Sequence, residues 1–167
     1  MRYMDIEEQV DADFTRARRR AFVRRMRARL RGGATRAGLR SFEEVRKAKG
    51  AYNGVRLGSR TVPVEKIVGS VGRHEDFDPD FLPAKASLEA RWKRIDRAYH
   101  RGEEMPPVVL RKLGDEYFVE DGNHRVSVAS FQGVEWIDAE VMYSRVPERE
   151  VRRIGAGPAT ADLPAAA

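Results

Sequence analysis

Apolar residues near the start of the chain recur at intervals of three and four. Residues 5–31 contain no glycine or proline, which predicts one long helix ended by Gly32 and Gly33. One face of this helix carries Ile6, Val10, Phe14, Ala17 and Ala21, and a further stripe carries Phe22, Met26 and Leu30. A capping box at residues 41–44 predicts a second helix to about residue 49. Because two such helices make little core alone, we expect them to pack on the rest of the chain or on a second copy.

From residue 53 the pattern changes to short apolar runs separated by turn residues. Residues 55–57 and 60–64 flank Gly58 and Ser59, which predicts a hairpin. Residues 65–68 are expected to form a helical turn and residues 69–83 a loop. A helix is predicted over residues 85–101, strands over 108–113 and 116–120, a helix from the turn at 121–125 to about 132, and a final strand over 134–143.

These patterns divide the chain into three parts. We predict a helical arginine-rich arm over residues 1–52, a core over residues 53–146, and an Ala/Gly/Pro-rich, disordered tail over residues 147–167. The 167 residues suffice for one domain and an extension. The sequence has no cysteine, no apolar run long enough for a bilayer and no signal peptide, so we expect a cytoplasmic protein without disulfides or thiolate chemistry.

The positive charge is concentrated in the arm. The net charge of the chain is +6, and residues 16–40 hold 11 arginines and no acid. Such a block can neutralise the phosphates of a nucleic acid. The residues proposed for that contact are Arg18, Arg19, Arg20, Arg24 and Arg25. The alternative is a solvated helix face whose arginines follow a general preference for arginine over lysine in this chain.

The segment Asp121-Gly122-Asn123-His124-Arg125 joins a predicted strand to a predicted helix. Glycine permits a sharp turn and a close approach of a ligand to the backbone. The N-terminus of the following helix offers unpaired N–H groups and a partial positive charge, which suits an anion. In this interpretation Arg125 contacts a phosphate, His124 donates a hydrogen bond or acts as a base, and Asn123 caps the helix.

Residues 117–129, Tyr-Phe-Val-Glu-Asp-Gly-Asn-His-Arg-Val-Ser-Val-Ala, resemble the signature of the ParB/sulfiredoxin superfamily. Residues 62–67, Val-Pro-Val-Glu-Lys-Ile, resemble the box that opens that fold, and residues 105–110, Met-Pro-Pro-Val-Val-Leu, resemble its middle step. The resemblance covers residues 54–146 and leaves out the arm and the tail. It implies an α+β fold with a small mixed sheet and flanking helices, here preceded by the helical arm.

The resemblance also implies a nucleotide site. Its phosphates would be bound by Gly122, Asn123, His124 and Arg125, and by Ser70, Gly72 and Arg73 from the segment after the first strand of the core. ATP, ADP or CTP with Mg²⁺ is the expected ligand, and Asp76 is a candidate ligand of the metal. The catalytic candidates are His124, Glu65 and Asp121, with Glu75 and Asp76 as other acids in reach of the pocket.

Departures from the family pattern separate its branches. Sulfiredoxin chemistry requires a cysteine beside the turn, and this chain has none. Partition proteins resemble it less, because their turn reads Gly-Glu-Arg-Arg and a helix-turn-helix domain follows. The Asp-Gly-x-His-Arg form is closer to the free-serine kinases of the superfamily.

The sequence is therefore consistent with three functions. The first is a nucleotide-binding hydrolase or small phosphotransferase. The second is a ParB-like DNA-binding module or nuclease that uses the arginine-rich arm. The third is a non-catalytic interaction protein that forms a homodimer through the arm. None of the three involves a membrane.

Overall fold

The computed structural model describes residues 5–32 and 38–147. Helix α1, Ile6–Leu30, begins after Asp5 and ends before Gly32, whose φ of 64° only glycine adopts readily. Its predicted inner face is confirmed, because Val10, Phe14, Ala17 and Ala21 are buried. The rest of the apolar stripe is exposed (Phe22 53%, Met26 37%, Leu30 83%) and forms the surface on which the predicted homodimer would depend.

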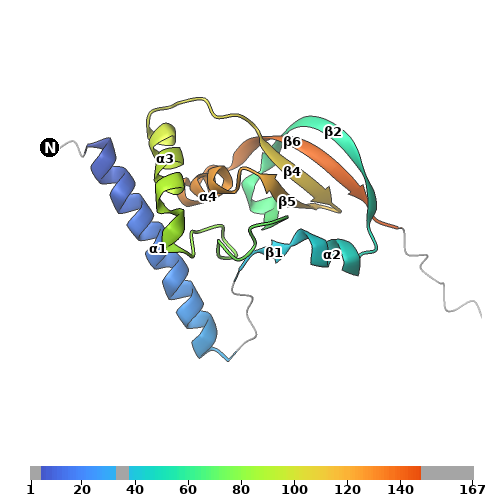
Figure 1. Cartoon of the computed structure of the whole chain (residues 1–167), viewed down its shortest axis with the longest axis horizontal. Helices are drawn as coiled ribbons and strands as arrows, with labels where there is room; N and C mark the ends of the chain where they lie inside the picture. Colours follow the sequence, from blue (N-terminus) through green and yellow to red (C-terminus); the bar gives the residue numbers. More distant parts are fainter. Residues whose placement is uncertain (1–4, 33–37, 148–167) are drawn as a thin grey trace, which may run out of the picture.

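A six-stranded mixed sheet forms the centre of the α+β fold, as the sequence predicts (Figure 1). Its order is β1-β3-β5-β4-β6-β2, with β1 Arg40–Ser41, β2 Tyr52–Pro63, β3 Ile67–Ser70, β4 Val108–Leu113, β5 Glu116–Asp121 and β6 Trp136–Arg145. Three neighbouring pairs are parallel (β1 with β3, β3 with β5, β4 with β6), and the other two are antiparallel.

The predicted hairpin at Gly58 and Ser59 is wrong. Residues 52–63 form one continuous strand, β2, which pairs antiparallel with β6 along its whole length. Gly58 has a φ of 76° and lies at a register shift between β2 and β6. The glycine therefore bends a long strand at a bulge instead of reversing the chain.

Two other element boundaries differ from the prediction. The helical turn is the short 3-10 helix η1, Val64–Lys66, and β3 then begins at Ile67 inside the segment expected to be helical or loop. The predicted helix over residues 85–101 begins with the 3-10 turn η2, Ala86–Leu88, and continues as α3, Glu89–His100. Helix α2, Phe42–Ala48, is confirmed, with Ser41 Oγ accepting a hydrogen bond from the Glu44 N–H at 3.5 Å.

Apolar side chains cover both faces of the sheet. On one face Val119, Val108 and Leu110 pack with Val126 of helix α4, Asn123–Gln132. On the other face Phe118 packs against Phe42 of α2, since successive residues of β5 point to opposite faces. Residues 38–52 thus contribute to the sheet and to the core beneath it, and the division of the chain at residue 52 stays a prediction.

Helix α1 packs against α3, which in turn packs against α4 (Figure 1). Phe14, Ala17 and Ala21 of α1 share a hydrophobic cluster with Trp92 of α3 and Val128 of α4. The arm therefore packs on the rest of its own chain, one of the two arrangements expected from its sequence. Within residues 5–32 and 38–147, none of the helices has the length and apolar character needed to cross a bilayer.

Candidate anion site at the N-terminus of helix α4

Gly122 forms the turn between β5 and α4. Its φ of 99° and ψ of 24° lie in the left-handed region, and the first helical bond runs from the Val126 N–H to the Gly122 carbonyl at 3.0 Å. A Cβ at this position would lie 2.7 Å from Val108 Cγ1. Glycine is thus required here by both backbone conformation and space.

Among the residues that the structure describes, no side chain caps the N-terminus of α4. Asn123, expected to cap it, is instead the first residue of the helix, so that prediction is wrong. Its side chain is buried, and its Oδ1 has no hydrogen-bond partner within residues 5–32 and 38–147. The N–H groups of the first helical turn therefore remain available to an anion.

Arg125 stabilises the turn through hydrogen bonds. Its guanidinium donates hydrogen bonds to the carbonyl oxygens of Pro106 and Pro107, the latter at 2.9 Å, and to Asp121 Oδ2 at 2.9 Å. Its side chain is 13% exposed. Arg125 thus fixes the turn against the chain segment that leads into β4, while its positive charge stays beside the site.

Three further arginines surround the turn. A cavity of about 220 Å³ is lined by Arg73, Arg91 and Arg94 together with residues 121–125. Arg73 pairs with Asp76 at 3.0 Å. Within the part of the chain that the structure describes, neither Arg91 nor Arg94 makes a hydrogen bond or an ion pair, and both are exposed. The cavity is therefore strongly positive.

Arg91 and Arg94 were not among the predicted site residues. Both lie on α3, about thirty residues before the turn, and the sequence offers only their spacing of three on a predicted helix as a signal. Lysines and arginines on a helical face are common without a ligand, so this spacing alone identifies no site.

His124 lies between the cavity and the core. Its ring is 5.5 Å from that of Phe77 in an edge-on arrangement, and both ring nitrogens are buried without a hydrogen-bond partner in the described part of the chain. Burial and the positive charges of Arg73 and Arg91 lower the pKa of His124 from 6.5 to about 4. The neutral imidazole carries one N–H donor and one acceptor.

We expect His124 to make stability depend on pH. Its pKa is about 4 in the folded protein, so between pH 4 and its ordinary value near 6.5 the unfolded chain binds more protons than the folded one. This contribution is fully present above pH 6.5 and is lost as the pH falls toward 4, by roughly 2 kcal/mol for a partly exposed ring. Urea unfolding at several pH values checks it. His124→Gln should flatten this dependence and His74→Gln should leave it, and equal curves for both variants would contradict the assignment.

The other predicted residues are not all brought to the cavity. The Ser70 hydroxyl is fully buried, donating to the Val119 carbonyl at 3.3 Å and accepting from the Arg73 N–H at 3.1 Å, so it positions the backbone of Arg73. Glu65 lines a separate cavity of about 560 Å³ near the other end of α4, beside Gly133. As a base for a ligand on Gly122, Glu65 is therefore in the wrong place.

The acids near Arg73 differ in whether their carboxylates are free to bind a metal ion in the cavity. Asp76 accepts from Arg73 at 3.0 Å and from Lys85 at 2.7 Å, so both of its oxygens already have cationic partners and it is poorly suited to hold Mg²⁺. Glu75 is exposed and, like Gly72, does not line the cavity. Asp121 does line it, and its side chain is 73% exposed beside Arg125.

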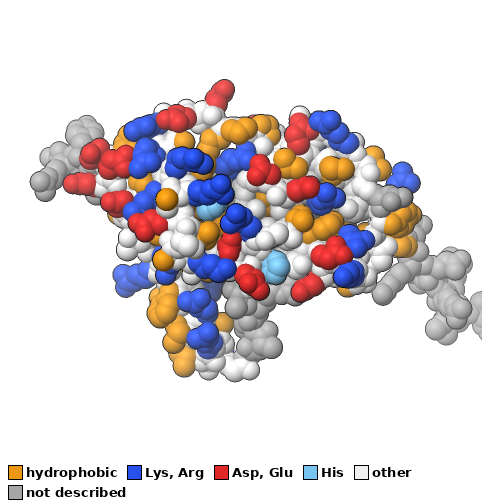
Figure 2. Space-filling model, viewed as in Figure 1, with side chains coloured by type: hydrophobic (Ala, Val, Ile, Leu, Met, Phe, Trp, Pro, Cys, Tyr) orange, Lys and Arg blue, Asp and Glu red, His pale blue; other side chains and the backbone are white. Residues whose placement is uncertain are grey.

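The five arginines proposed for nucleic acid lie on two sides of α1. Arg19, Arg20 and Arg24 line a groove of about 880 Å³ with Arg16, Arg27 and Arg31, whereas Arg18 and Arg25 face a small hollow beside Asp78. Asp80 is the acid in the groove, where it pairs with Arg24. Figure 2 shows basic side chains over α1 and α3, next to an apolar strip on the C-terminal half of α1.

Comparison with protein-family models and with curated proteins finds no match for this chain. Among solved structures it is similar to the crystal structure of sulfiredoxin from Arabidopsis thaliana. The two share 17% identity with a TM-score of 0.38, over 50% of this chain and 82% of that chain. The relationship is distant.

Proposed function

We propose that the cavity at the N-terminus of α4 binds the phosphate groups of a nucleotide. The observation that carries this proposal is an uncapped helix N-terminus faced by two arginines, Arg91 and Arg94, that have no partner among the described residues. Free N–H groups and unpaired guanidinium groups together form strong hydrogen bonds to phosphate oxygens.

The size of the cavity limits what it can enclose. About 220 Å³ is below the range of roughly 300–1,000 Å³ typical of sites that enclose a whole small molecule. A short phosphate chain fits this volume, and the ribose and base would extend into solvent. We therefore expect little selectivity among ATP, ADP, CTP and GTP.

Phosphoryl transfer to water or to a small acceptor is the reaction that the proposed site supports. The exposed carboxylate of Asp121 is suited to hold Mg²⁺ beside bound phosphates, and the neutral ring of His124 is suited to donate a hydrogen bond to a phosphoryl oxygen. Asp121 thus takes the metal role first assigned to Asp76. Developing charge on the phosphoryl oxygens would be stabilised by Arg91 and Arg94.

Calorimetric titration of ATP, ADP, CTP and GTP with and without Mg²⁺ tests this function. The double variant Arg91→Gln and Arg94→Gln should weaken nucleotide binding by at least about 100-fold, because each charge-assisted hydrogen bond contributes about 1.5 kcal/mol or more. Both side chains are exposed, so the fold should be unaffected. The control is Arg60→Gln with Arg101→Gln, which removes the same charge elsewhere; equal affinities in the two double variants would refute the proposal.

The arginine groove of α1 supports a second candidate, contact with the backbone of a nucleic acid. Six arginines line it, and one of them, Arg20, also lies 5.2 Å over the ring of Phe131. Binding there would fall steeply with salt and would be unchanged by loss of Arg91 and Arg94. Titration of a DNA duplex against the same variants separates this candidate from the nucleotide site.

A further inference from the structure

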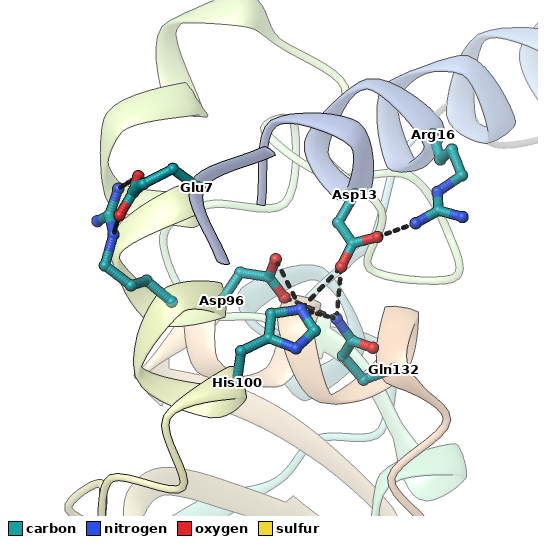
Figure 3. A network of polar contacts seen from close by, with 7 residues as sticks. Glu7, Asp13, Arg16, Asp96, His100 and Gln132 are labelled. Atoms are coloured by element: carbon teal, nitrogen blue, oxygen red, sulfur yellow. Dashed lines mark hydrogen bonds and ion pairs between the residues drawn. The ribbon is translucent and has the colours of Figure 1, made fainter. Parts of the chain in front are cut away.

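A second polar cluster is enclosed where α1, α3 and α4 meet. Asp13 of α1 and Asp96 of α3 are 2% and 0% exposed, and His100 lies one helical turn after Asp96. Gln132, the last residue of α4, completes the cluster. The same three helices share the apolar cluster around Trp92. Figure 3 shows these side chains converging from the three helices.

The polar atoms around His100 Nε2 lie at separations close to those between the ligands of one metal ion. His100 Nε2 lies 2.9 Å from Asp13 Oδ2, 3.6 Å from Asp96 Oδ2 and 3.4 Å from the Gln132 side-chain nitrogen. The Gln132 nitrogen in turn lies 3.1 Å from Asp13 Oδ2. Four ligands at about 2.0–2.1 Å around a tetrahedral metal ion are separated by about 3.3 Å. The observed separations fall on both sides of that value.

One atom of the cluster lacks a partner at hydrogen-bond distance. Asp96 Oδ2 is buried and accepts no hydrogen bond from any group in residues 5–32 and 38–147. It faces His100 Nε2 at 3.6 Å, too far for a hydrogen bond. A buried carboxylate oxygen without a donor is costly, and a cation between Asp13, Asp96 and His100 would satisfy it.

We propose that Asp13, Asp96 and His100 bind a Zn²⁺ ion. Their ligand atoms all lie within 4.8 Å of one another. The fourth ligand is the amide oxygen of Gln132. A 180° flip of the side-chain amide brings this oxygen to the position that the amide nitrogen now occupies. An imidazole with carboxylate and amide oxygens suits zinc, whereas calcium requires six to eight oxygens at 2.3–2.6 Å.

Such an ion would join the arm to the anion site. Asp13 belongs to the arm, and Asp96 is on the same helix as Arg91 and Arg94. Gln132 ends the helix whose first turn faces those arginines. The site is separate from the proposed nucleotide cavity, so either proposal can fail while the other stands.

Calorimetric titration of ZnCl₂ into chelator-treated full-length protein tests the proposal. We expect one Zn²⁺ per chain, and a loss of affinity of at least about 100-fold in Asp96→Asn and in His100→Gln. The matched controls are Asp11→Asn, an exposed acid on α1, and His74→Gln, outside the cluster. Both controls should bind Zn²⁺ as the wild type does.

A second measurement covers the case in which the variants fail to fold. The chain has three histidines, so a Zn²⁺ titration followed by NMR of the imidazole signals should shift one set strongly. The His74→Gln and His124→Gln spectra assign the other two sets by elimination. Wild-type protein that does not bind Zn²⁺, binding that survives both Asp96→Asn and His100→Gln, or a shift at His74 or His124 instead, would overturn the proposal.

Discussion

Replacing Gly122 with alanine is expected to destabilise the protein by about 3 kcal/mol and to abolish nucleotide binding. A left-handed backbone costs an L-residue about 1–2 kcal/mol, and the new Cβ would lie 2.7 Å from Val108 Cγ1, which adds about 1–3 kcal/mol of overpacking. The same Cβ would also crowd the Arg125 guanidinium at 3.1 Å. Urea unfolding and nucleotide titration measure the two effects.

Gly133 provides the matched control at the other end of the same helix. Its φ is 72°, also left-handed, but a Cβ there would meet no atom within 4 Å. Gly133→Ala should therefore cost only about 1–2 kcal/mol and leave nucleotide binding unchanged. Equal destabilisation by the two substitutions would show that contact with Val108 has no effect on stability. A stable Gly122→Ala protein that still binds nucleotide would remove the turn from the proposed site.

The local chemistry of the sequence was sufficient to predict this turn. Glycine after a strand-like run, followed by a polar residue and an apolar helical pattern, specifies a strand, a left-handed residue and a helix, and the structure has all three. The actions of the side chains were harder to predict. Arg125 contacts the carbonyl oxygens of Pro106 and Pro107, and backbone acceptors eighteen or more residues away leave no mark in the sequence.

The hairpin prediction was wrong for the same reason, because it depends on a contact that is distant in the sequence. Gly58 and Ser59 between two apolar runs is a typical hairpin signal, and it is also what a bulge in a long strand looks like. The choice is made by β6, which lies about eighty residues later and pairs with both halves of β2. The local pattern identified which residues are in strands. Pairing with the distant strand β6 determined that they form one strand instead of two.

The polar cluster at the meeting of the three helices was beyond sequence reasoning. Asp13 and His100 are 87 residues apart, and Asp13 and Gln132 are 119 residues apart. Only Asp96 and His100 share a helical spacing, of four. Metal sites built on one motif are visible in a sequence, whereas a site assembled by packing three helices becomes visible only when the packing is known.

Trp92 takes part in that packing, and Trp92→Ala is expected to cost about 4 kcal/mol. Its ring is fully buried, 5.6 Å from Phe14 of α1 and 5.5 Å from Phe131 of α4, so it contacts both helices that flank α3. Its indole N–H donates to Ser127 Oγ at 2.9 Å, and truncation leaves that buried hydroxyl without its donor. Phe or Trp to Ala in a core costs about 3–5 kcal/mol.

Trp136 is the internal control for this substitution. It lies on β6 and is 56% exposed, so Trp136→Ala should cost less than about 1 kcal/mol. Urea unfolding of both variants compares them directly. If Trp92→Ala releases α1 from α3 and α4, the Zn²⁺ affinity proposed above should fall with it, because Asp13 would leave Asp96 and His100. Similar stabilities for the two tryptophan variants would mean that the arm is held by other contacts.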